Sequence, residues 1–308
     1  MSIKLGSGNI SKLYLGSTEI TKAYLGSTEV YSTGAPATND NFELTVETTA
    51  ANESFLLPMT GVTSIDIDWG DGTVDTGITA DNPTHTYATA GTHSISVSGS
   101  ATGVQFDGSG SEGKLRTVTN LGALGWTNFA LAFQNCSNMT SFECGDTDTS
   151  NVNTMRRMFF NCSSLTTLDV SGFDTSSVGN VFYMFNGCSS VTALDVSGFD
   201  ISLVNNLGGM FRNCSALTSI DVSQWDTSNV QYLGQFGGAF QSCSSLENLD
   251  IDGWDVTSLT NGTNFLFGAN NALTTAQYDA VLIEWAAQAV QSNVTIHFGD
   301  ATYTAAAA

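Results

Sequence analysis

The stretch that decides the fold runs from residue 158 to residue 176 and reads MFFNCSSLTTLDVSGFDTS. Its cysteine, Cys162, recurs at a spacing of 26 residues as Cys136, Cys188 and Cys214, and after 29 residues as Cys243. A phenylalanine stands three residues before each of these cysteines. A fixed period of this length predicts a solenoid, in which one short supersecondary unit stacks on the next.

Within one repeat, the spacing Leu165-x-x-Leu168-x-Val170 predicts a short strand. Side chains alternate across a strand, so Leu168 and Val170 are expected to point inward and Asp169 outward. The Gly-Phe-Asp-Thr-Ser phrase that follows predicts a turn capped by its own side chains. We therefore expect residues 114–273 to form a right-handed solenoid with one short parallel strand per repeat.

The C-terminal part of the chain breaks the pattern. A degraded sixth copy has Phe267 at the phenylalanine position and Asn270 at the cysteine position. Beyond it, residues 275–290 have the apolar spacing of an amphipathic helix, and residues 294–298 alternate like a strand. We expect the segment from residue 274 onward to cap the open end of the solenoid.

The regular cysteines have two possible roles. Equivalent positions in neighbouring coils lie about 5 Å apart, so disulfides between coils are geometrically conceivable. Pairing successive cysteines would leave one of the five out, and a row of buried free thiols is the preferred interpretation. The cysteine spacing and the three histidines predict no zinc site, no other metal and no cofactor.

The charge of the chain is strongly acidic. The formal net charge is -21, and residues 31–308 carry 5 basic and 27 acidic side chains. Such a field repels phosphate backbones, so we expect no nucleic-acid partner. The sequence has no apolar run of membrane-spanning length and no signal-peptide core near its start, and we expect no membrane insertion.

Residues 1–31 contain a shorter repeat of ten residues, in which Tyr-Leu-Gly-Ser-Thr-Glu occurs at 14–19 and again at 24–29. Each copy reads as a strand, a Gly-Ser turn and a second strand. Such small units bury little alone, which favours an attachment or homo-oligomerisation segment over a poorly ordered arm. The candidate attachment residues are the apolar ones: Leu13, Tyr14, Leu15, Ile20, Tyr24, Leu25 and Val30.

Residues 42–106 read as all-β, with alternating strands at 42–46, 63–69 and 93–98. Trp-Gly-Asp-Gly-Thr at 69–73 and His-Thr-Tyr at 85–87 resemble the polycystic kidney disease (PKD) β-sandwich. The resemblance implies an immunoglobulin-like spacer, set off by linkers at 32–41 and 107–113. Asp66, Asp68 and Asp71 suggest calcium, but their spacing is not an EF-hand loop, and a tight Asp71-Gly72 turn is the simpler interpretation.

Two columns of aspartates recur with the repeat. The turn column, Asp148, Asp174, Asp200, Asp226 and Asp255, is expected to bond backbone amides. The strand column faces the sheet surface and is the candidate binding face; it consists of Asp169, Asp195, Asp221 and Asp250. A solvated acidic surface is preferred there over one bridged by divalent cations.

The repeat phrase Met-Phe-x-x-Cys-Ser-Ser-Leu-x-x-Leu-Asp-Val-Ser-Gly-Phe-Asp-Thr-Ser closely resembles the BspA-like leucine-rich repeat family of bacterial surface proteins, over residues 129–273. The resemblance implies surface display and adhesion and does not imply an enzyme. The ten-residue segments at the N-terminus are similar to N-terminal regions of phage structural proteins. That similarity is short.

The predicted fold is mainly β with short helices. It comprises a β-repeat arm at 1–31, a PKD-like sandwich at 42–106, and a leucine-rich repeat solenoid with its cap at 114–308. The predicted function is that of a phage virion accessory protein: a head fibre, decoration or tail-tip protein on the virion surface. Its N-terminus would bind a capsid or tail protein, and its solenoid a host surface protein or glycan. The alternative is a bacterial cell-surface adhesin.

Overall fold

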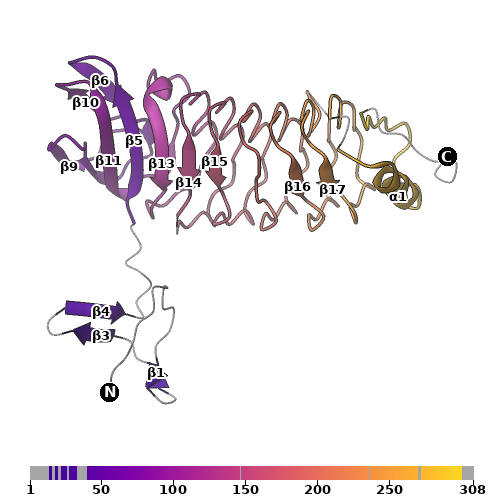
Figure 1. The fold of residues 1–308 in the computed structure, drawn as a ribbon, viewed down its shortest axis with the longest axis horizontal. Coiled ribbons are helices and arrows are strands. Elements are labelled where there is room, and N and C mark those ends of the chain that lie inside the picture. Colours follow the sequence, from indigo (N-terminus) through magenta and orange to yellow (C-terminus); the bar gives the residue numbers. More distant parts are fainter. Residues whose placement is uncertain are drawn as a thin grey trace. The chain divides into compact units, whose positions relative to one another are not determined.

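The structure is a computed structural model. It describes strand residues 14–15, 18–19, 22–25 and 28–32, and then residues 40–145, 147–234, 236–269 and 272–299. The chain divides into two compact units, Met1–Asn39 and Asp40–Ala308 (Figure 1). Among the described residues the structure is mainly β, with one α-helix and one short 3-10 helix.

The first unit contains two hairpins. β1 (Tyr14–Leu15) pairs antiparallel with β2 (Thr18–Glu19), and β3 (Lys22–Leu25) pairs antiparallel with β4 (Thr28–Ser32). The strand–turn–strand prediction is confirmed for these two copies of the ten-residue repeat. Of the candidate attachment residues, five lie on these strands, whereas Leu13 and Ile20 lie outside the described residues.

The second unit begins with an antiparallel sheet in the order β5-β11-β8-β9. Its strands are β5 (Phe42–Thr48), β8 (Ser64–Asp68), β9 (Val74–Ile78) and β11 (Gly91–Ser100). Two short pairs accompany it: β6 (Glu53–Leu56) with β10 (Thr84–Tyr87), and β7 (Met59–Thr60) with β12 (Gly103–Val104). As the alternation predicts, Phe42, Leu44 and Val46 are buried.

The Trp-Gly-Asp-Gly-Thr motif forms a tight turn, as the sequence predicts. An Oδ1 atom of Asp71 accepts a hydrogen bond from the Thr73 amide at 3.0 Å, and its Oδ2 lies 2.8 Å from Nε2 of His85. The buried Trp69 stacks on the His85 ring, and the Tyr87 hydroxyl donates to the Trp69 carbonyl at 2.9 Å. These contacts account for the motif without an ion.

The main sheet does not stop at the predicted linker. η1 (Glu112–Lys114) leads into β13 (Leu115–Asn120), which pairs antiparallel with β5 and parallel with β14 (Ser141–Glu143). β15 (Thr167–Asp169) follows, so one seven-stranded sheet has the order β15-β14-β13-β5-β11-β8-β9. The expected spacer and the first repeats are therefore parts of one unit, because the edge of β5 is covered by the first strand of the repeats.

Two ion pairs reinforce this junction. Nζ of Lys114 lies 3.2 Å from Glu53, and Nε of Arg116 lies 2.7 Å from Glu47. The composition of residues 107–113 is typical of a linker, but it does not reveal that the next strand pairs back across the chain.

Residues 115–273, called the repeat stack below, continue with β16 (Ser219–Asp221) and β17 (Asn248–Asp250), which pair in parallel (Figure 1). The copy between β15 and β16 contributes only a single parallel bridge, from Ala193 to Ser219. Each strand shows the predicted alternation, with Leu168 and Ile220 buried between exposed neighbours. One short strand is thus observed in four of the five copies that carry the repeat cysteine.

Phenylalanines and thiols form the interior of the stack. The rings of Phe133, Phe159, Phe185, Phe211 and Phe240 stack in succession at centroid distances of 5.1–5.7 Å. The thiol of Cys162 donates to the Phe133 carbonyl at 3.1 Å, and the later repeats copy this bond. All six cysteines are buried and free, which confirms the prediction of buried thiols.

The sixth copy differs from the prediction by one position. Leu266, not Phe267, is buried at the place of the earlier phenylalanines, and Ala269 takes the cysteine place, where its amide donates to the Leu266 carbonyl at 2.9 Å. Phe267 is instead half exposed. The sequence favoured the wrong register because matching the aromatic residue outweighed matching the backbone spacing.

The end of the stack is covered by α1 (Thr275–Ala286), which begins with a capping box between Thr274 and Gln277. Its Val281 and Trp285 are buried. The predicted strand at 294–298 appears as a single parallel bridge from Ile296 to Gly262. The predicted helix is confirmed but ends four residues earlier than expected, at residue 286 instead of 290.

Candidate binding surface

The strand-column aspartates lie exposed along one face, where the parallel register sets Asp221 beside Asp250 and Glu143 beside Asp169. Each aspartate uses one Oδ1 to accept a hydrogen bond from the backbone amide two residues later, at 3.0–3.2 Å. In the first three copies a serine hydroxyl donates to the same oxygen at 2.7–2.8 Å. These carboxylates therefore end the strands with a turn.

The turn column is built in the same way, and the prediction that it bonds backbone amides is confirmed. Oδ1 of each aspartate accepts from the amide two residues later at 2.8–3.1 Å. The hydroxyl and amide of Ser176 lower the pKa of Asp174, and those of Ser197 lower the pKa of Asp195 in the strand column. Both columns therefore fulfil a local structural role.

One shallow hollow lies on the strand face. It has a volume of about 310 Å³ and is lined by residues 193–196 and 219–221, including Asp195 and Asp221. It coincides with the copy whose strand is reduced to a single bridge. Oδ1 of each of its carboxylates already accepts hydrogen bonds from its own turn.

A different part of the repeat stack gathers aromatic rings and guanidinium groups. The guanidinium carbon of Arg157 lies 5.2 Å from the Phe160 ring centroid and 5.5 Å from that of Tyr183. The Phe182 ring lies 4.1 Å from that of Tyr183 and 6.3 Å from that of Phe236. With the nearby Arg212 these residues form what we call the aromatic–arginine surface: Arg157, Phe160, Phe182, Tyr183, Arg212 and Phe236.

Three members of this surface have an unusual backbone conformation, although only Phe236 is strongly exposed and Tyr183 is buried. Arg157, Tyr183 and Phe236 have φ angles of 55°, 59° and 65°, in the left-handed region that L-residues seldom adopt. Gly209 also has a positive φ, and a Cβ there would lie 1.9 Å from a Tyr183 ring carbon. Glycine at this position lets the tyrosine ring lie against the next coil.

Phe236 belongs to the one irregular spacing in the array. Between Leu207 and Phe211 there are three residues, whereas between the corresponding Leu233 and Phe240 there are six. The amides of Leu207 and Phe211 bond the carbonyls of Tyr232 and Ala239, so the extra residues bulge outward between two matched contacts. The Tyr183 hydroxyl donates to the Phe236 carbonyl and ties this bulge back to the earlier coils.

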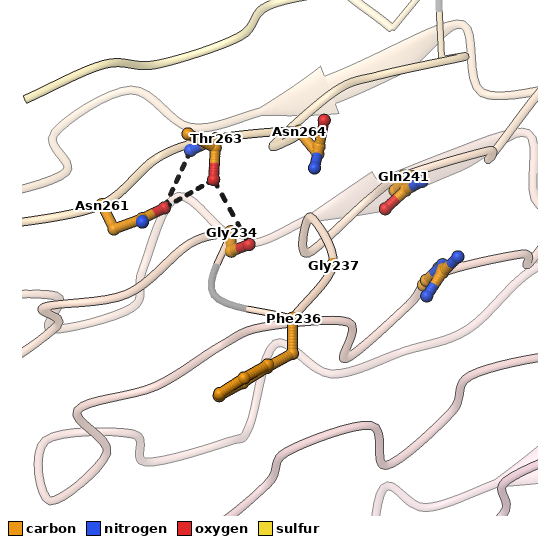
Figure 2. A pocket seen from close by; sticks show the side chains of 8 residues that line it. Gly234, Phe236, Gly237, Gln241, Asn261, Thr263 and Asn264 are labelled. Atoms are coloured by element: carbon orange, nitrogen blue, oxygen red, sulfur yellow. Dashed lines mark hydrogen bonds between the residues drawn. The ribbon is translucent and has the colours of Figure 1, made fainter.

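Phe236 separates two hollows and is 72% exposed. The larger, of about 350 Å³, is lined by Arg212, Gln241, Asn261, Thr263 and Asn264 together with the glycines of the bulge. Figure 2 shows the labelled side chains of Gln241, Asn261, Thr263 and Asn264 on one side of the bulge and the Phe236 ring on the other. The smaller, of about 220 Å³, is lined by Phe182 and by Asn180, Asn205 and Asn206.

The surface is basic within an acidic protein. Of the five basic residues after position 31, Lys114 and Arg116 are paired with glutamates, and the other three are Arg156, Arg157 and Arg212. Among the described residues none of these three forms an ion pair. The buried Nε atoms of Arg157 and Arg212 have no hydrogen-bond partner there either. Of the two, Arg212 lines the larger hollow, where its charge can attract an anionic partner.

Sequence reasoning missed this surface because its members occupy positions that vary between repeats. Two signals were present: the spacing of 29 instead of 26 residues, and the concentration of the few arginines at 156–157 and 212. Neither signal reveals that these segments, together with the coil of Tyr183 between them, contribute to one surface.

Neither a metal-binding cluster nor a membrane-spanning helix is present among the described residues. In the described part of the chain, no cluster of three or more His, Cys, Asp or Glu side chains is arranged to hold a metal ion. Within the same residues, no helix is both long enough and apolar enough to span a bilayer.

The chain matches the model of a protein family. The family described as "Mycoplasma protein of unknown function, DUF285" matches residues 127–233 and 192–306, which together cover more than half of the chain. The chain belongs to this family. The match covers the repeat stack and the cap and leaves the two N-terminal regions unassigned. Neither the curated proteins nor the solved structures contain a match.

Proposed function

We propose that this DUF285 protein is a binding protein, attached through residues 1–31 and adhering to a cell surface through its repeat stack. As part of this proposal, we assign residues 42–106 to a PKD-like, immunoglobulin-like module. We assign residues 114–308 to a BspA-like leucine-rich repeat solenoid with its cap. Such arrays present extended surfaces for partners.

The observation that carries the proposal is the exposed Phe236. A phenylalanine that is 72% exposed and at positive φ is unfavourable both for solvation and for the backbone. It lines two hollows, and Arg212 lines the larger of them with it. Concave sites with an aromatic wall and a few convergent polar groups are typical of ligand binding.

Binding is preferred to catalysis because of how the carboxylates are used. General acid–base hydrolysis of a glycan needs two carboxyl groups facing one bond. Here the aspartates of both columns accept hydrogen bonds from the turns that they end.

For the setting we propose the surface of a phage particle. Residues 1–31, with their similarity to phage structural proteins, would dock on a capsid or tail protein, and the acidic remainder would project outward as a head fibre, decoration or tail-tip protein. The alternative setting is the surface of a bacterium, as the resemblance to BspA-like adhesins suggests.

The test of adhesion measures binding of the fluorescently labelled full chain to intact bacterial cells by flow cytometry. We expect Phe236→Ala to reduce cell binding at least about tenfold without changing the melting temperature, because this side chain is exposed. Ile283→Ala on α1 is the matched control, since Ile283 is 56% exposed and lines neither hollow of the surface. Unchanged binding by Phe236→Ala would contradict the proposed role of the surface.

The test of attachment compares the full chain with residues 32–308. The two β-hairpins of residues 1–31 bury too little to fold alone and should self-associate or dock. We expect the full chain to sediment as an oligomer, or to assemble into particles, and the truncated chain to sediment as a monomer with the same melting temperature. A truncated chain that assembles normally would place the anchor elsewhere.

A further inference from the structure

We infer that the aromatic–arginine surface binds a saccharide chain that carries carboxylate groups, such as uronic or sialic acid residues. This inference rests on the proposed adhesive function and names the ligand class of the same surface.

The rings provide the first argument. Phe236 and Phe182 are exposed or half-buried, and their centroids lie 6.3 Å apart at an interplanar angle of 82°. An exposed ring face offers a flat apolar platform with a negative quadrupole, which suits the C–H groups of a sugar ring. Two rings at a steep angle fit a chain that bends past them better than one flat aromatic ligand.

The guanidinium groups provide the second argument. Arginine binds carboxylates through two parallel N–H···O bonds, which its two terminal amino groups can donate. The Nε atoms of Arg157 and Arg212 are buried, so only the terminal groups can reach a ligand. Arg212 lines the larger hollow and forms no ion pair among the described residues, so its terminal groups can bind a ligand carboxylate there.

The amides provide the third argument. Oδ1 of Asn261 accepts from the amide and hydroxyl of Thr263 at 3.0 and 2.8 Å, and Oε1 of Gln241 accepts from the Gly238 amide at 3.2 Å. With these oxygens in use, the side-chain N–H groups are the free ends of both amides in this hollow. Sugar hydroxyl groups accept such hydrogen bonds.

The two hollows separated by Phe236 suit a chain-like ligand. Successive sugar units could lie on either side of the ring, one in the hollow of about 350 Å³ and one in that of about 220 Å³. A single-stranded nucleic acid also combines rings with negative charge. The saccharide is favoured because it can carry one carboxylate among neutral sugar units, whereas a nucleic acid carries a phosphate at every unit and is repelled more strongly by a chain of net charge -21.

The test is calorimetric titration of the full chain with purified probes. Trigalacturonate and 3′-sialyllactose are the acidic saccharides, the methyl ester of trigalacturonate and lactose are their neutral counterparts, and hexathymidylate represents nucleic acid. We expect at least one acidic saccharide to bind at least about tenfold more tightly than its neutral counterpart, with affinity falling as salt increases. The two acidic probes distinguish a uronate from a sialate.

The variants locate the binding. Arg212→Gln and Phe236→Ala should each lower the affinity for the acidic probe at least about tenfold. Arg116→Gln removes the same charge outside the surface, where Arg116 pairs with Glu47, and should change affinity less than about threefold. Equal weakening by Arg116→Gln and Arg212→Gln would mean that only net charge matters and would overturn the site.

The remaining outcomes separate this inference from the proposed function. Equal affinity for acidic and neutral sugars, no binding of any saccharide at millimolar concentration, or binding of hexathymidylate in place of the saccharides would each overturn the ligand class. If cell binding still depends on Phe236 in those cases, the adhesive function stands with another ligand. If cell binding does not depend on Phe236, the function fails as well.

Discussion

The strand face and the aromatic–arginine surface are built on the same coils, but they use the repeat in opposite ways. On the strand face Asp169, Asp195 and Asp221 occupy one position and bind the same turn atoms at nearly the same distances. At the corner, equivalent and neighbouring positions hold different side chains, and an insertion places Phe236 in solvent.

This difference separates stability from recognition. A residue that recurs in every coil is explained by the coil itself, because it forms the same turn or the same packing contact in each copy. A residue that departs from the array at a local cost, as the 72% exposed Phe236 does, has no such explanation and points to a ligand. The predictions below test the regular side first and then the irregular one.

The largest expected effect is on the buried strand positions. Leu168→Asp would bury a carboxylate in the interior, where Leu168 is 8% exposed, and should lower the free energy of unfolding by about 3 kcal/mol or more. Thr167→Asp, on the exposed side of the same strand, is the control and should change it by less than about 1 kcal/mol. Chemical denaturation measures both, and equal melting of the two variants would refute the inward assignment of Leu168.

The second effect concerns thiol reactivity. Burial raises the pKa of the repeat cysteines, that of Cys243 to about 12, so the native protein should react very slowly with thiol reagents at neutral pH. The denatured, non-reduced protein should instead label at all six cysteines. Quantitative labelling with mass detection that finds two or fewer thiols after denaturation would indicate disulfides between coils.

These regular features were the predictable ones. The 26-residue period gave the inward positions, the buried thiols and the turn aspartates, because each is set by spacing within one copy. The pairing of β13 with β5 was not predictable, since it depends on which strand edge is left uncovered. The contact between Tyr183 and the Phe236 segment joins residues 53 apart and follows no repeat rule.

A smaller effect separates backbone strain from side-chain contact. Gly209 and Gly253 both have positive φ, but a Cβ at Gly209 would clash with the Tyr183 ring, whereas one at Gly253 has nothing within 4 Å. Both alanine variants should have a lower free energy of unfolding, because alanine disfavours a positive φ angle. The loss should be at least about 1 kcal/mol larger for Gly209→Ala. Only Gly209→Ala should also weaken cell binding. Equal effects of the two variants in denaturation and binding would argue against the placement of the tyrosine ring.

The smallest effect is a pH dependence at the junction before the stack. The Thr49 amide, together with Lys114, lowers the pKa of Glu53 from 4.5 to about 2. A lowered folded-state pKa stabilises the fold above pH 4.5, and that contribution is lost as the pH falls through about 2. The free energy of unfolding is therefore expected to fall less between pH 6 and pH 3 for Glu53→Gln than for the wild type. An identical difference would remove the role assigned to this carboxylate.

The most direct test of the central claim compares the two faces in one binding experiment. Cell binding is measured for Phe236→Ala and for the triple variant Asp169→Asn, Asp195→Asn and Asp221→Asn, which keeps an oxygen acceptor in each turn. We predict at least a tenfold loss (about 1.4 kcal/mol) for Phe236→Ala and less than about a twofold change for the triple variant. The opposite result, with binding lost in the triple variant and retained in Phe236→Ala, would show that the regular strand face recognises the partner.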